Sequence, residues 1–176
     1  MYLPPGETLL SIIDTATFSS LWYWLAYGTA WAMTTHWVMG APFDLIWSAR
    51  RGQDNARADL DAVVDVHTRR LIHFARLGGH WIVGLLGFLL TLLGTLGFYY
   101  GSELARGLFF LLTPLALTWA MSFRFAARLH RTPLAGEALA GALLKLRLKF
   151  QVIAMLSIFV TAAYSTFILL EAYYIP

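Results

Sequence analysis

Four long apolar stretches alternate with polar segments along this chain, at residues 18–39, 81–101, 104–123 and 152–174. A helix needs roughly 20 apolar residues to cross the hydrocarbon core of a bilayer, and each stretch has about that length. Helix is expected for all four, because hydrocarbon offers no partners to backbone amides and a helix pairs them within one segment. The pattern therefore predicts an all-α integral membrane protein, with residues 1–176 forming a single four-helix membrane domain.

The polar segment between the first two stretches, residues 41–79, has a periodicity of its own. From residue 57 to residue 78 its apolar positions recur at helical spacing on one face, and they are Leu60, Val63, Val64, His67, Leu71 and Phe74. This predicts an amphipathic helix on the inner membrane surface or against a partner, ended by Gly78 and Gly79. The place of His67 on the apolar face favours a packed residue or a pH-sensitive contact over a metal ligand.

The second polar segment, residues 124–150, leads into the fourth stretch. Thr132 and Pro133 predict the start of a helix, because threonine caps helices and proline is favoured at the first helical position. From Leu134 the helix is expected to continue into the fourth stretch over roughly 40 residues, or about 60 Å. This length exceeds a bilayer, so its first half is expected to extend into the cytoplasm.

Basic residues are concentrated in these two polar segments. Twelve of the thirteen Lys and Arg residues lie there, and the other, Arg106, belongs to the turn between the second and third stretches. Because loops rich in Lys and Arg stay in the cytoplasm, both segments are predicted to be cytoplasmic and both termini periplasmic. We therefore expect a multi-pass protein of a bacterial inner membrane.

Membrane phospholipids are an expected partner of the basic residues. Each basic side chain near an anionic membrane surface contributes about 1 kcal/mol to binding. The headgroup-binding candidates are Arg50, Arg51, Arg69, Arg70, Arg76, Arg124, Arg128, Lys145, Arg147 and Lys149. Nucleic acid is not expected, because membrane topology already accounts for these charges.

Composition narrows the chemistry. Hydrophobic residues make up 59% of the chain and charged residues 13%, whereas a soluble protein has about 25% charged residues. There is no cysteine, which excludes disulfides, thiol nucleophiles and cysteine-ligated zinc or iron–sulphur sites. No ionisable residue lies near the centre of a stretch, which argues against an ion-coupled pump, and phosphate-loop, serine-elbow and His-Glu-x-x-His motifs are absent. We expect no enzymatic activity and no catalytic residues.

His36 and His80 are the candidate cofactor ligands. His36 ends the first stretch and His80 precedes the second, so both are predicted to lie at similar depth near the inner interface. Such a pair is able to ligate a haem iron or a chlorophyll magnesium. Ordinary interfacial histidines have the same pattern and are the favoured interpretation, so no cofactor or metal is expected.

Two rows of small residues predict where helices pack. One row is Gly84, Gly87, Thr91 and Gly94 in the second stretch, and the other is Ser157, Thr161 and Ser165 in the fourth. Small residues let helix backbones approach closely in lipid, where no hydrophobic force brings helices together. The favoured interpretation is packing within the bundle, and the alternative is that one row binds a separate membrane subunit.

Three motifs early in the chain are distinctive: FSSLWYW at residues 18–24, THWVMGAPFD at 35–44 and ARR at 49–51. They resemble a family of small alphaproteobacterial inner-membrane proteins labelled as a component of the SufBCD iron–sulphur assembly complex. The resemblance covers the first two stretches and the segment between them, and beyond these only the hydropathy plan matches. It implies membrane tethering, because a chain without cysteine cannot be a thiolate scaffold for clusters.

Three functions fit these observations. The leading hypothesis is a non-catalytic accessory or anchoring subunit of a larger inner-membrane complex, either respiratory, photosynthetic or associated with iron–sulphur assembly. One alternative is the small membrane subunit of a tripartite transporter, whose span count fits but whose termini are expected inside. The other is a haem-binding or pigment-binding membrane protein that uses His36 and His80.

Overall fold

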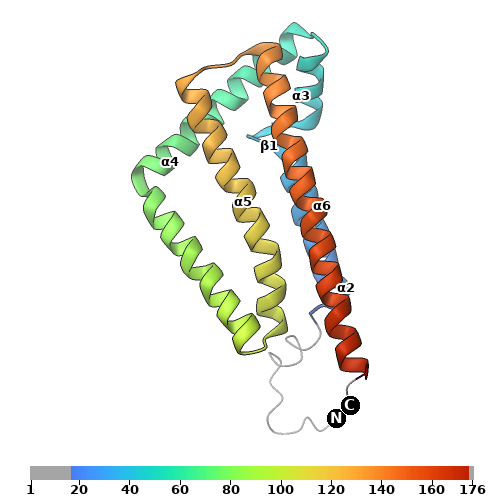
Figure 1. Cartoon of the computed structure of the whole chain (residues 1–176). Helices are drawn as coiled ribbons and strands as arrows, with labels where there is room; N and C mark the ends of the chain where they lie inside the picture. Colours follow the sequence, from blue (N-terminus) through green and yellow to red (C-terminus); the bar gives the residue numbers. More distant parts are fainter. Residues whose placement is uncertain (1–16, 175–176) are drawn as a thin grey trace, which may run out of the picture.

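The computed structural model describes residues 17–174, with side chains up to residue 170, and this part of the chain is almost entirely helical (Figure 1). Its elements are α2 (Leu21–His36), β1 (Trp37–Val38), β2 (Ala41–Pro42), α3 (Phe43–Arg50), α4 (Asp54–Gly94), the π-helix η1 (Thr95–Tyr99), α5 (Glu103–Arg131) and α6 (Gly136–Tyr174). The predicted all-α fold is therefore confirmed, and the structure adds a short hairpin whose two strands have two residues each.

Three helices in the described residues are long and apolar enough to cross a membrane, which supports a membrane-embedded protein. They are Asp54–Tyr99, Glu103–Arg131 and Gly136–Leu170, and they contain most or all of the second, third and fourth predicted stretches. α2 has 16 residues, about 24 Å of helix, and is shorter than the roughly 20 residues of a typical span.

The first predicted stretch, residues 18–39, is not helical to its end. α2 ends at His36, and β1 and β2 form an antiparallel hairpin in which Val38 pairs with Ala41. The turn residues Met39 and Gly40 have positive φ angles of 54° and 78°, and glycine adopts this conformation at little cost. The hairpin buries Val38 and Ala41 completely and leads directly into α3.

α4 consists of two helices that follow one another across a kink, over 41 residues in all. Gly78, at the kink, has non-helical backbone angles, with φ −153° and ψ 20°. The predicted end of the amphipathic helix at Gly78 and Gly79 is therefore confirmed, and the second helix starts directly after it. Sharp kinks occur at glycine pairs because no side chain restricts the backbone there. Figure 1 shows the two halves of α4 running in different directions from this point.

The connection between α5 and α6 also differs from the prediction. Thr132 follows the end of α5 instead of starting a helix, and its hydroxyl donates a hydrogen bond to the carbonyl of Arg128 at 3.0 Å. α6 begins at Gly136, beyond Pro133. It then runs for 39 residues, about 58 Å, so the predicted continuous helix through the fourth stretch is confirmed.

The hairpin, α3, the first halves of α4 and α6 and the last turns of α5 pack together at one end of the molecule, which we call the head (Figure 1). The predicted apolar face of residues 57–78 is used only in part, because Leu60 and Val64 are fully buried whereas Phe74 is 58% exposed. The core of the head consists of Val38, Met39, Ala41, Ile46, Ala49, Ala56, Leu60, Val64, Ala126, Leu139, Ala140, Leu143, Leu146 and Phe150.

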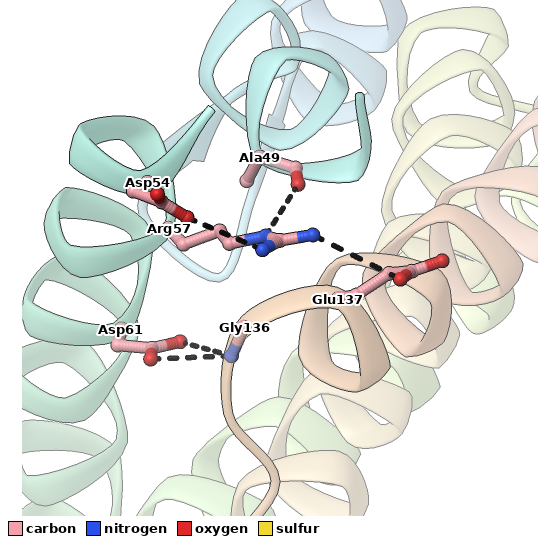
Figure 2. Close-up of polar contacts among 6 residues, drawn as sticks. All are labelled: Ala49, Asp54, Arg57, Asp61, Gly136 and Glu137. Atoms are coloured by element: carbon pink, nitrogen blue, oxygen red, sulfur yellow. Dashed lines mark hydrogen bonds and ion pairs between the residues drawn. The ribbon is translucent and has the colours of Figure 1, made fainter. Parts of the chain in front are cut away.

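Asp61 caps the start of α6 from another helix (Figure 2). Both of its carboxylate oxygens accept hydrogen bonds from the backbone N–H of Gly136, at 2.9 and 3.1 Å. The first N–H groups of a helix have no partner within the helix, and a negative charge there is favourable. This contact from α4 takes the place of the local threonine cap that the sequence predicts.

Arg57 connects three elements beside this cap (Figure 2). Its Nε donates a hydrogen bond to the carbonyl of Ala49 at 3.4 Å. Its other guanidinium nitrogens lie 3.3 Å from the carboxylate of Asp54 and 3.9 Å from that of Glu137. Exposed ion pairs each contribute only about 0–1 kcal/mol, so the cap by Asp61 is the stronger constraint.

Replacing Asp61 with alanine should lower the free energy of unfolding by about 1 kcal/mol, the usual cost of removing a helix cap. The matched control is Asp59→Ala, which removes an exposed carboxylate from the same helix. Thermal denaturation of the two variants in the same detergent measures the difference. Equal melting temperatures for the two variants would contradict the capping role.

Candidate functional site at the bend of α4

An apolar cavity of about 570 Å³ lies beside the bend of α4. This volume falls within the range of about 300–1,000 Å³ typical of ligand pockets. Its walls come from the head and from the apolar segments of α4 and α5, so it lies where the two regions meet. The lining residues are Thr34, Trp37, Met39, Gly40, His67, Leu71, Phe74, Ile82, Thr118, Trp119, Ser122, Phe123 and Phe150.

The cavity exists because α4 and α5 touch at one end and diverge toward the head (Figure 1). Where η1 meets α5, Arg106 Nε donates a hydrogen bond to the carbonyl of Gly97 at 2.6 Å. A Cβ added to Gly97 would lie 2.8 Å from Cγ of Arg106, so only glycine permits this approach. At the other end the bend at Gly78 separates the two helices and leaves room for the cavity.

The hydroxyl groups in the cavity wall already donate hydrogen bonds. Thr34, Thr118 and Ser122 each donate to a backbone carbonyl of their own helix, at 2.8, 2.7 and 3.0 Å. They therefore present only acceptor lone pairs to the cavity. Because the rest of the wall is mainly aliphatic and aromatic, the cavity suits an apolar occupant.

His67 is the titratable group of the cavity wall. Its ring packs on the hairpin turn, where a Cβ added to Gly40 would lie 2.9 Å from Nδ1. Burial lowers the pKa of His67 below its ordinary 6.5, and the charge of Arg70 adds to this effect, because both disfavour the imidazolium form. The imidazole is therefore neutral at pH 7, and this position agrees with the packed residue that the apolar face predicts.

Arg70 lies on the head side of the cavity, where it lines two shallow grooves. The neighbouring Arg69 forms an ion pair with Asp65 at 3.0 Å, whereas Arg70 has no ion pair within residues 17–170. The grooves share part of their walls with the cavity through Trp37, Gly40, His67 and Phe74. An available positive charge thus adjoins an apolar cavity.

The other headgroup candidates fall into two groups. Three have partners within the chain: Arg50 lies 3.6 Å from Glu137, while Arg51 and Arg147 lie over the rings of Trp47 and Phe43, at 5.2 and 3.7 Å. The second group is exposed and has no ion pair within residues 17–170, and it consists of Arg76, Arg124, Arg128, Lys145 and Lys149. The sequence does not distinguish these groups, because Glu137 and Phe43 come from segments distant from Arg50 and Arg147, and only the contact of Arg51 with Trp47 is local.

His36 and His80 are both exposed, and each ring contacts the adjacent tryptophan. Their centroids lie 5.9 Å from Trp37 and 5.6 Å from Trp81, respectively. The ring contacts of the described residues do not include one between the two histidines. Within that same part of the chain, no three His, Cys, Asp or Glu residues are grouped so as to hold a metal ion.

The small-residue row of α6 packs against α2. The hydroxyl of Tyr27 hydrogen-bonds to Ser157 and, at 2.9 Å, to Thr161. Ser165, one turn further, is also buried. This row therefore contributes to packing within the bundle, through a tyrosine that the sequence reasoning did not single out. The sequence feature that could have identified Tyr27 is its hydroxyl group within an apolar stretch, because such a group needs a polar partner in lipid.

The small-residue row of α4 has a different environment. A Cβ added to Gly84 or Gly87 would meet no atom within 4 Å, and Thr91 is exposed. Only Gly94, near the turn into α5, has a close neighbour, with Phe109 at 3.5 Å from the added Cβ. Most of this row is therefore not used in packing within the described part of the chain.

The cavity itself was missed by the sequence reasoning. Ile82, Trp119 and Phe123 are apolar residues within predicted spans, and their spacing does not separate cavity-lining residues from lipid-facing ones. The cavity depends on the direction in which α4 continues after the break at Gly78, and the sequence pattern predicts the break but not this direction.

Replacing Gly40 with alanine should destabilise the protein, because the added Cβ meets His67 and because a positive φ costs alanine about 1–2 kcal/mol. Gly28→Ala is the control: Gly28 lies in α2 with open space around it, and alanine there should stabilise the helix by about 1 kcal/mol. Melting temperatures measure both changes. Adding His67→Ala to Gly40→Ala should recover part of the loss, and no recovery would contradict the contact between the two residues.

Comparisons with protein-family models, with curated proteins and with solved structures found no match, so the function is argued from the residues and their arrangement.

Proposed function

We propose that this protein is a non-catalytic accessory or anchoring subunit of a larger complex in a bacterial inner membrane. In this proposal the first apolar stretch, residues 18–39, which contains α2, is a fourth span beside the three candidate spans. The head lies in the cytoplasm and both termini lie in the periplasm.

The charge distribution supports this orientation. All Lys and Arg residues except Arg106 lie in segments 41–79 and 124–150, and segments rich in such residues stay in the cytoplasm. The exposed side chains of Arg124, Arg128, Lys145 and Lys149 are then close to the anionic inner leaflet. Each contributes about 1 kcal/mol to holding the head at the membrane surface.

The observation that carries the proposal is the uncovered membrane half of α4. In the most apolar part of each helix, 11% is buried in α4, 17% in α5 and 22% in α6. Trp81, Val83 and Leu85 are 75, 70 and 70% exposed. α4 and α5 come together only toward η1, where Arg106 contacts Gly97. The side of this half of α4 that faces away from α5 is therefore left open by the described helices, and a helix of another subunit is able to pack there.

The residues on this half of α4 suit such a contact. Gly84 and Gly87 lie one turn apart, with open space around both. Helices associate in lipid mainly by close packing, which small residues allow. The corresponding row of α6 is already occupied by Tyr27, so α4 is the helix that remains available.

A compact head on a membrane stem suits tethering. The head has its own hydrophobic core, and its exposed surface is able to hold a cytoplasmic component at the membrane. The resemblance to the SufBCD-labelled family makes an iron–sulphur assembly complex one candidate host, and a respiratory or photosynthetic complex is the other.

Purification of the tagged protein from native membranes in a mild detergent should recover a larger complex with a stoichiometric partner. The double variant Gly84→Leu/Gly87→Leu should lose this partner, because bulky side chains fill the space that a partner helix needs. Its own fold should be retained, since both positions are open and leucine favours helix over glycine by nearly 1 kcal/mol. Mass spectrometry of the eluted chains is the measurement.

The control for this experiment is Gly28→Leu, which adds one leucine side chain at an open position of α2 and should keep the partner. Elution of the wild-type protein without any stoichiometric partner would overturn the proposed function. Equal loss of the partner with the α2 and α4 variants would overturn the assignment to α4.

A further inference from the structure

We infer that the cavity at the bend of α4 binds one acyl chain of an anionic phospholipid, whose phosphate group is held by Arg70. This inference rests on the membrane orientation proposed above but not on the accessory role, because it concerns a lipid that the chain carries whether or not a partner is bound.

The position of the cavity points to a lipid chain. Ile82, Trp119 and Phe123 belong to the apolar segments, and His67 and Gly40 belong to the head, so the cavity spans the boundary between the two. In the proposed orientation this boundary is the inner membrane interface. Lipid chains are the most abundant apolar groups there, and an empty cavity would forgo the dispersion contacts that a chain provides.

The wall chemistry agrees with an acyl chain. The wall is mainly aliphatic and aromatic, and its three hydroxyl groups donate to backbone carbonyls. A ligand with many polar atoms would lose hydrogen bonds to water without replacement. A hydrocarbon chain has no such atoms.

The charge beside the cavity points to an anionic headgroup. Arg70 lines both grooves that continue from the cavity, and it is free of ion pairs within the described residues. A guanidinium binds phosphate with paired hydrogen bonds. Arg50 and Arg69, by contrast, already pair with carboxylates of the chain.

His67 adds a neutral donor at the same place. It lines both the cavity and one of the grooves, and no hydrogen bond to its ring exists among the described residues. A neutral imidazole donates one hydrogen bond, which suits a phosphate or ester oxygen between the headgroup and the chain. Its contact with the turn at Gly40 fixes the ring in this position.

Native mass spectrometry of the protein purified in a mild detergent tests the inference. The wild-type protein should retain one phospholipid per chain, and after delipidation it should rebind phosphatidylglycerol in preference to phosphatidylcholine. Arg70→Gln should weaken phosphatidylglycerol binding roughly fivefold, the effect of one basic side chain at an anionic surface. Arg131→Gln, a change at an exposed arginine of α5 that lines none of these pockets, should have little effect.

A second variant tests the cavity separately from the charge. Ser122→Phe places a large side chain into the cavity and should abolish retention of phospholipids of either headgroup, with a melting temperature close to that of the wild type. Equal effects of Arg70→Gln and Arg131→Gln would assign the binding to general surface attraction and overturn the site. Unchanged retention in Ser122→Phe, or retention of an apolar molecule without a phosphate, would overturn the inference as well.

Discussion

The structure depends on one constraint, which is that α4 and α6 are longer than a bilayer is thick. The two helices have 41 and 39 residues, each about 60 Å of helix, whereas a hydrocarbon core measures about 30 Å. The excess length of both helices lies on the same side, where the head forms. There Leu60 and Val64 of α4 pack in one core with Leu139 and Leu143 of α6, and Asp61 caps the first turn of α6.

The head fixes one end of α4, and the turn at η1 fixes the other. Between them the helix bends at Gly78, so that it leaves α5 near the head and returns to it at Gly97, where Arg106 makes a close contact. The bend has two consequences. It opens the cavity beside His67, and it exposes the membrane half of α4 to lipid or to a partner.

The coarse architecture could be predicted from the sequence because it depends on local patterns. Apolar stretches of about 20 residues predict helices wherever they occur, and the continuous path into α6 follows from the unbroken pattern after residue 134. The wrong predictions concern local structures that are determined by contacts with residues distant in the sequence. Thr132 was expected to cap α6, but Asp61 from α4 takes that role, and no local pattern contains this information.

The hairpin and the bend show a second limit of sequence patterns. Trp37 and Val38 continue the apolar stretch of α2, so hydropathy alone extends the helix past His36. Gly40 indicates a turn in the sequence. That glycine is required there becomes clear only from the structure, in which His67 leaves no room for a Cβ. The glycine pair at 78–79 predicts the break in α4, where Gly78 has non-helical backbone angles. The direction in which the helix continues after the break depends on what packs on either side, which the local sequence does not contain.

The most direct test of the account is photo-crosslinking in native membranes from position 85 of α4, with position 155 of α6 as the control. Leu85 and Met155 are 70% and 71% exposed, so a probe at either position contacts the lipid or protein that surrounds the apolar helices. If α4 is the contact surface for a partner subunit, the probe at position 85 should crosslink to one defined protein and the probe at position 155 mainly to lipid. Lipid crosslinks alone at both positions would contradict the claim that α4 is the contact surface of a subunit.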